Sequence, residues 1–205
     1  MRNQKASYNR YEQVKDFIIG KSVLEIGFWD HNDLWEYHAR GAHYWYGIDF
    51  NKEAVQLAQN KGFDAIQWDL ETMGIPKADR SFDCILMRHV LEHLDNVVLF
   101  LVKLSEYYHP KMIVIEVPNA GWWALPFYTA ITDMHLDYHS PLHVREFLPR
   151  HFYEITKRAK ILNVTEIRYL HSFGTTFFGH FVDYIIGMLF PKLRRNLLCI
   201  LKNKG

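Results

Sequence analysis

Short apolar runs alternate along the chain with longer segments in which apolar residues recur at helical spacing. The short runs end in an acidic residue, a glycine or a proline, which is typical of buried strands, whereas the longer segments are typical of amphipathic helices. Strands are expected over 22–26, 44–49, 64–68, 82–87 and 112–117. Helices are expected over 8–20, 32–40, 51–62 and 89–107, with a polar loop over 70–81.

Strands that alternate with helices predict an α/β protein with a doubly wound parallel sheet covered on both faces. Sheets of this kind bind ligands at the carboxyl ends of their strands. Several polar residues and one glycine lie at or just after those ends, so we expect them to meet at one edge: Glu25, Gly27, Asp49, Asp69, Arg88 and His89.

The turn after the first strand combines a glycine with the start signal of a helix. Gly27 ends that strand, and the polar residues Asp30 and Asn32 can cap the helix that follows. A strand, a tight glycine turn and a helix N-terminus together form a site for a nucleotide-like ligand.

Composition limits the class of protein. The 205 residues, 49% of them apolar, predict one globular domain over 1–205 that begins with a cap helix over 1–20. A net charge of +1 without a dense basic block argues against a nucleic-acid partner. Two cysteines, no signal-peptide core and no apolar stretch long enough to cross a bilayer predict a soluble, cytoplasmic protein.

Three segments together resemble a known family: VLEIG at 23–27, GIDFNKEAV at 47–55 and DLETMGIPKADRSFDCILMRHVLEHL at 69–94. In this order and spacing they look like the small-molecule branch of the class I S-adenosylmethionine-dependent methyltransferases, over about residues 20–120. The resemblance implies a Rossmann-like methyltransferase fold, with a seven-stranded, mostly parallel sheet that ends in an antiparallel hairpin. Residues 164–171 and 195–202 then supply the last two strands.

The resemblance also implies S-adenosylmethionine as the cofactor and assigns its adenosine part. Asp49 would accept hydrogen bonds from the ribose hydroxyls, with Phe50 next to it among the cofactor-binding residues. Asp69 would receive the adenine amine, and Leu70 would lie beside the ring.

At the methionine end, Gly27 would let the backbone approach the cofactor, Glu25 would orient the turn, and Arg88 and His89 would border the reacting methyl group. Where the family has G-x-G-x-G, this chain has Gly-Phe-Trp-Asp-His at 27–31. Two outcomes stay open. Trp29 and its neighbours bind the cofactor along another path, or the site is lost and the chain is a non-catalytic methyltransferase-like binding protein.

Residues 118–145 are rich in aromatics and histidines and are expected to form a lid insertion over the acceptor. In an extended chain, the alternate residues Asp133, His135, Asp137 and His139 would face one side. They are open to three interpretations: a metal site of a metal-dependent enzyme, a polar loop that caps turns, or a source of a general base.

We predict no metal site and nominate His139, His135 and His89 as catalytic candidates. The predicted reaction is methyl transfer to oxygen or nitrogen of a small molecule or glycan.

A second insertion, an apolar helix, is expected over 172–194. Its core, FFGHFVDYIIGMLF at 177–190, is followed by PKLRR. Apolar bulk beside basic residues predicts possible peripheral membrane contact through 177–190. Burial against the sheet or against a second copy is the alternative, and the sequence does not predict the oligomeric state.

Overall fold

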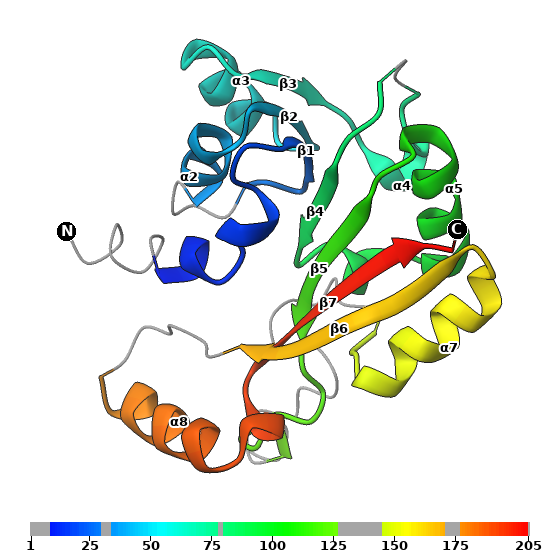
Figure 1. Cartoon of the computed structure of the whole chain (residues 1–205). Coiled ribbons are helices and arrows are strands. Elements are labelled where there is room, and N and C mark those ends of the chain that lie inside the picture. Colours follow the sequence, from blue (N-terminus) through cyan, green and yellow to red (C-terminus); the bar gives the residue numbers. More distant parts are fainter. Residues whose placement is uncertain (1–8, 30–33, 78–79, 127–144, 171–176, 205) are drawn as a thin grey trace.

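The computed structural model describes residues 9–29, 34–77, 80–126, 145–170 and 177–204, without the side chains of 177–181 and 183. A seven-stranded sheet in the order β3-β2-β1-β4-β5-β7-β6 runs through the molecule (Figure 1). Its strands are β1 (Ser22–Ile26), β2 (Tyr44–Asp49), β3 (Asp64–Gln67), β4 (Cys84–Arg88), β5 (Met112–Pro118), β6 (Leu162–Leu170) and β7 (Asn196–Asn203). The strands β1 to β5 are parallel, and β7 is antiparallel to both β5 and β6. The predicted fold class is confirmed.

Helices cover both faces of the sheet (Figure 1). They are η1 (Lys15–Phe17), α2 (Leu34–Gly41), α3 (Lys52–Asn60), α4 (Leu70–Met73), η2 (Leu91–His93), α5 (Val97–Tyr108), α7 (Pro149–Ala159), α8 (Phe177–Leu189) and η3 (Pro191–Leu193). Alternate strand residues feed two cores, because side chains of a strand point to opposite faces. Ile26 and Met87 pack with α5 and α7, whereas Val23 and Leu86 pack with α2 and α3.

The register brings the carboxyl ends of the central strands to one edge. Ile26 lies opposite both Ile48 and Met87, and Arg88 lies opposite Glu116. Whatever follows these residues is therefore close in space, as the alternation of strands and helices predicts.

Three predicted elements differ from those observed. Instead of one helix over 8–20, the described residues form a helical turn at 9–12 and the 3₁₀ helix η1. The predicted helix over 89–107 is wrong before residue 97, because His89 has a positive φ of 54° and the Asn96 side chain caps α5 by accepting from the Leu99 N–H. The predicted loop over 70–81 begins with the short helix α4.

Candidate active site

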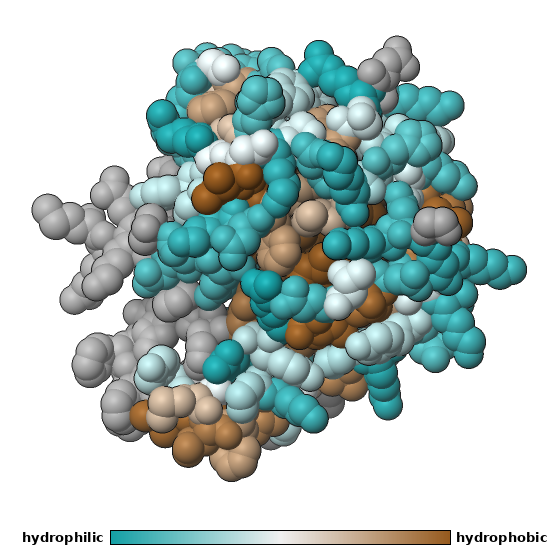
Figure 2. All heavy atoms as spheres, viewed as in Figure 1, coloured by the Kyte–Doolittle hydropathy of each residue, from teal (hydrophilic) through white to brown (hydrophobic). Residues whose placement is uncertain are grey.

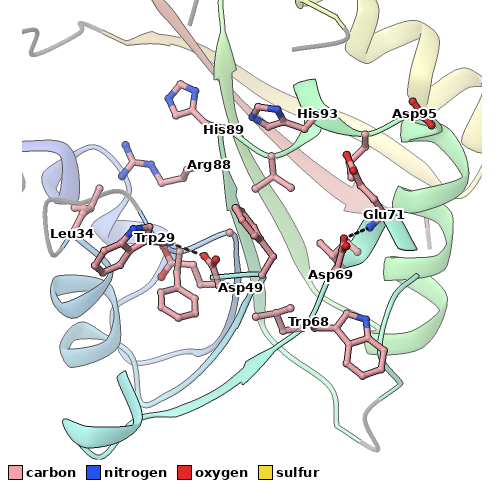
Figure 3. A pocket seen from close by; sticks show the side chains of 18 of the residues that line it. Trp29, Leu34, Asp49, Trp68, Asp69, Glu71, Arg88, His89, His93 and Asp95 are labelled. Atoms are coloured by element: carbon pink, nitrogen blue, oxygen red, sulfur yellow. Dashed lines mark hydrogen bonds between the residues drawn. The ribbon is translucent and has the colours of Figure 1, made fainter. Parts of the chain in front are cut away.

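A cavity of about 890 Å³ opens at the carboxyl ends of β1, β2 and β4 (Figure 3). Each predicted site residue that the structure describes lines it: Glu25, Gly27, Trp29, Asp49, Phe50, Asp69, Leu70, Arg88 and His89. Asp49 lies between Trp29 on one side and Asp69 on the other, with Arg88 and His89 at the far end from Trp68 (Figure 3). The chain thus collects at one edge residues that are up to 64 positions apart in sequence, from Glu25 to His89.

Gly27 makes the sharp turn after β1. Its backbone φ is +68°, a value that residues with a side chain rarely adopt. Its N–H donates to the Ile48 carbonyl at 2.8 Å. A Cβ at this position would collide with the Val90 side chain, which comes from the loop after β4. Glycine is therefore required here by close packing as well as by conformation.

Asp49 is buried at the end of β2, with 3% of its surface exposed. Its Oδ2 accepts from the Trp29 backbone N–H at 2.9 Å, and its Oδ1 accepts from the Asn51 N–H at 2.8 Å. Burial raises the pKa of Asp49, and these backbone donors oppose the rise. A carboxylate has about four lone-pair directions, so Asp49 can still accept further hydrogen bonds from a ligand.

Trp29 stands where the family has its second glycine. It is half-buried, it does not have a positive φ, and it forms one wall of the cavity. This position therefore does not require a glycine conformation in this chain, and the indole leaves the cavity open. Asp30 and His31 lie outside the described residues.

Glu25 is buried and belongs to the support beneath the turn. His38 Nδ1 lies 2.7 Å from its Oε1, and the Trp45 indole N–H donates to its Oε2 at 2.8 Å. These bonds join β1 to α2 and β2, which fixes the elements on either side of the glycine turn.

Asp69 begins α4 as its N-cap. Its side chain accepts from the Thr72 hydroxyl at 2.8 Å and from the Glu71 N–H at 2.9 Å, which lowers its pKa. The apolar residues Leu70 and Phe50 line the same part of the cavity, and 73% of the Phe50 surface is exposed.

At the β4 end of the cavity, the lining residues Arg88 and His89 belong to a buried ionic cluster that the sequence analysis did not predict. Glu116, at the end of β5, is 2% exposed; its Oε2 accepts from Arg88 Nε at 2.6 Å, and its Oε1 accepts from Asn196 Nδ2 at 2.7 Å. Burial alone would raise the pKa of Glu116, but Arg88 and His89 hold it well below its usual range. A charge inside an otherwise apolar strand was the available signal, as it was for Glu25.

His89 connects the cluster to the cavity. Its Nδ1 lies 3.1 Å from Glu92 Oε1, and its Nε2 lies 3.7 Å from Glu116 Oε1. Burial acts to lower its pKa, but the two carboxylates outweigh burial and raise the pKa to about 9. His89 is therefore protonated near neutral pH and suits the role of a hydrogen-bond donor better than that of a general base.

Other lining residues also escaped sequence reasoning, among them Arg10, which precedes β1. No periodic or motif signal in the polar N-terminal segment singles it out. The four residues at alternate positions for which a metal site was one interpretation lie outside the described residues: Asp133, His135, Asp137 and His139. Within the described part of the chain, no three His, Cys, Asp or Glu side chains are placed to hold a metal ion.

None of the helices in the described ranges combines the length and the apolar composition required of a membrane span.

Comparison with known proteins agrees with this architecture. Residues 6–163 match a protein family described as a methyltransferase domain. Demethylmenaquinone methyltransferase of Tropheryma whipplei is 34% identical over 86 residues, which make up 40% of this chain and only 36% of that enzyme. The chain therefore spans little more than a third of the curated relatives it matches.

Two solved structures show the same fold. A SAM-dependent methyltransferase from Archaeoglobus fulgidus gives a TM-score of 0.64 at 20% identity, covering 98% of this chain and 94% of that chain. Magnesium protoporphyrin IX methyltransferase from Synechocystis PCC 6803, solved with bound S-adenosylhomocysteine, gives 0.65 at 11% identity, covering 99% and 86%. The family match and the fold define a methyltransferase domain. The chain belongs to the class I S-adenosylmethionine-dependent methyltransferase family.

Proposed function

We propose that this chain transfers the methyl group of S-adenosylmethionine to an oxygen or nitrogen atom of a small-molecule acceptor. The observation that carries the proposal is a cavity at the carboxyl edge. It is lined by Asp49 and Asp69, which follow β2 and β3, by Gly27 after β1, and by Arg88 and His89 at the end of β4. The two Tropheryma relatives act on demethylmenaquinone by name, which favours a small acceptor. A glycan acceptor stays a prediction that no comparison tests.

The residues fit the cofactor. A volume of about 890 Å³ falls within the range of roughly 300–1,000 Å³ that small-molecule and cofactor sites occupy. Gly27 presents backbone rather than a side chain at the end of β1. Asp49 is fixed by backbone donors and retains acceptor capacity for two ribose hydroxyls.

Phe50, exposed beside Asp49, supplies an aromatic face for the adenine ring. Asp69 and Leu70 would flank the same ring, the carboxylate toward its amine and the leucine against its face. Each of these groups comes from the end of β2 or from the segment after β3, so the adenosine part is held between two neighbouring strands.

When bound, S-adenosylmethionine supplies a methyl group on a sulfonium, and its transfer is a displacement that depends mostly on alignment. At the end of the cavity near β4, protonated His89 would donate a hydrogen bond to the acceptor through its Nε2–H and stabilise an oxygen that carries negative charge, since Nε2 lies 3.7 Å from Glu116 Oε1, beyond hydrogen-bond distance. Its Nδ1 is within hydrogen-bond distance of Glu92, and the charges of Glu92 and Glu116 would keep the imidazole protonated. His139 and His135 stay the candidates for removing a proton from the acceptor.

The second candidate function is a non-catalytic binding protein of the same fold. The observation that favours it is the replacement of the second family glycine by Trp29 and of the third by His31. Both candidates share the scaffold and differ in whether the cofactor binds.

Calorimetric titration of the purified chain with S-adenosylmethionine and with S-adenosylhomocysteine separates them. Saturable binding of both compounds with one-to-one stoichiometry is expected of the enzyme. A folded protein with a cooperative thermal transition that binds neither compound would exclude the methyltransferase and leave the binding protein.

A further inference from the structure

The C-terminal end of α8 exposes a cluster of large apolar side chains. Tyr184, Met188, Leu189 and Phe190 expose 56%, 52%, 62% and 59% of their surfaces within seven consecutive residues. We call these four residues the α8 patch. The other large hydrophobic residues exposed in the described ranges are scattered over separate elements. A contiguous apolar patch on a protein surface marks an interaction site more often than isolated residues do.

The helix stands apart from the sheet. Figure 1 shows α8 extending away from the strands, and Figure 2 shows its hydrophobic surface at the same extremity. Among the described elements its main packing partner is the short helix η3. Arg194 fixes the connection, because its guanidinium donates to the Gly187 carbonyl and to the Tyr169 carbonyl, both at 2.9 Å. The patch is thus held at a defined position while its apolar side chains remain uncovered.

The charged residues that follow the patch in sequence are all basic. Lys192, Arg194 and Arg195 follow the patch directly, and no acidic residue occurs between Asp183 and residue 205. Lys192 is exposed. Apolar side chains on a helix beside lysine and arginine are typical of elements that lie in the interface of an anionic membrane.

Two aromatic residues that follow β5 contact the segment directly after the patch. Trp122 and Trp123 are half-buried, and the Trp123 N–H donates to the Leu193 carbonyl at 3.4 Å. The Arg195 guanidinium lies over the Trp122 ring, 5.2 Å from its centroid. Tryptophan and tyrosine are enriched at the boundary between lipid tails and water.

A second copy of the chain is a poorer occupant for this surface. A two-fold symmetric contact presents the same residues from both partners, so the basic segment after the patch would be present twice, with Asp183 of each copy as the nearest acidic residue in sequence. Insertion across a bilayer is also excluded for this helix, because 13 residues span only about 20 Å.

We propose that the α8 patch docks on the surface of an anionic lipid bilayer, with α8 lying in the plane of the interface. The Asn119 side chain, just after β5, donates to the Arg194 carbonyl at 2.6 Å and to the Lys192 carbonyl at 3.1 Å. The segment that follows the patch is therefore fixed to the carboxyl end of β5, the same edge of the sheet as the cavity. A bilayer bound there would lie next to the open edge of the molecule.

Co-sedimentation with vesicles tests the proposal. The whole chain is mixed with vesicles of phosphatidylglycerol and phosphatidylcholine, or of phosphatidylcholine alone, at low and high salt. We expect binding to the anionic vesicles that weakens with salt, and at least tenfold weaker partitioning into neutral vesicles. Leu189→Glu should lower partitioning into anionic vesicles by about tenfold or more, since it removes an apolar contact and adds a repelled charge.

Leu99→Glu is the matched control, because Leu99 is 47% exposed on α5 and the substitution is the same. It should bind vesicles as the unchanged chain does, and both variants should retain the thermal midpoint. The proposal is overturned if the unchanged chain does not sediment with anionic vesicles, if the two variants bind equally, or if binding is the same for neutral vesicles. It is also overturned if sedimentation velocity shows a dimer that Leu189→Glu converts to a monomer.

Discussion

The two ends of the cavity hold their carboxylates by different means. At the β2 end, Asp49 is fixed by two backbone N–H groups, and Asp69 caps a helix through nearby residues. At the β4 end, Glu116 is fixed by the side chains of Arg88 and Asn196. Backbone donors are part of the fold and leave the carboxylate free to accept more, whereas the ionic cluster is satisfied only if every member is present.

This difference separates the roles of the two ends. Asp49 and Asp69 can exchange or add partners without leaving an unpaired charge, as a ligand site requires. Glu116, in contrast, stabilises the protonated state of His89 and the position of Arg88 at the cavity. We therefore expect substitutions at the β4 end to affect stability strongly and those at the β2 end to affect ligand binding.

The largest expected effect is that of Glu116→Gln. It removes the negative charge that compensates buried Arg88 and the partly exposed His89, and breaking a buried pair such as Arg88–Glu116 costs about 3–5 kcal/mol of unfolding free energy. The matched control is Glu166→Gln. Glu166 also accepts from an arginine Nε at 2.6 Å, but that pair is exposed, so its loss should cost about 0–1 kcal/mol. Urea denaturation of both variants measures the difference, and comparable losses would refute the energetic role of burial.

Gly27→Ala should have the next largest effect. Gly20 has nearly the same φ, +69° against +68°, and open space where a Cβ would be. Gly20→Ala therefore reports the backbone cost alone, about 1–2 kcal/mol, while Gly27→Ala adds overpacking against Val90, about 1–3 kcal/mol. In the double variant Gly27→Ala with Val90→Ala, part of the unfolding free energy that overpacking removes should be recovered. Equal losses for the two glycines would show that Val90 does not constrain the turn.

The charge of His89 gives the β4 end a pH dependence. The folded pKa of about 9 lies above the ordinary value of 6.5, so the stabilisation is fully present below pH 6.5 and is lost as pH rises through 9. His89→Asn, whose side chain tolerates a positive φ, removes this contribution. The unfolding free energies of the two proteins, measured in urea from pH 6 to 10, should differ most at low pH and converge at high pH. A constant difference over that range would contradict the assigned charge state.

The smallest effect on stability is expected at the β2 end. Phe50→Ala removes a side chain that is 73% exposed, so the unfolding free energy should change by less than about 0.5 kcal/mol. Affinity for S-adenosylhomocysteine should fall by about tenfold, since the adenine loses an aromatic contact. Tyr153→Ala, an exposed aromatic on α7, serves as the control for nonspecific effects. If both variants bind equally well, Phe50 has no role at the adenine.

The same contrast explains what the sequence could predict. At the β2 end several contacts lie within a few residues, such as Asp49 with Asn51 and Asp69 with Glu71, and local motifs record them. The bond from the Trp29 N–H to Asp49 spans 20 positions and is the exception. The Glu116 cluster joins residues 28 and 80 positions apart. One sequence contains no local signal of such pairings, although the charge of Glu116 within an apolar strand marked it as unusual.

The predicted start of α5 was wrong for a related reason. The segment from His89 to Asn96 has helical periodicity, yet the positive φ of His89 and the Asn96 cap delay α5. Trp29 raised the expectation of either another path for the cofactor or a lost site, because the family has a glycine there. Its actual place, with the backbone N–H on Asp49 and the indole in the cavity wall, depends on β2, which the spacing of the turn alone does not encode.

The central claim is that Asp49 anchors the methyl donor at the carboxyl edge of the sheet. The most direct measurement is calorimetric titration of Asp49→Asn and Asp64→Asn with S-adenosylhomocysteine, because Asp64 is an exposed aspartate at the start of β3, on the opposite edge. We expect Asp49→Asn to bind about ten- to a hundredfold more weakly than the unchanged chain, and Asp64→Asn to bind as well as it does. Unchanged affinity in a folded Asp49→Asn protein would contradict the account.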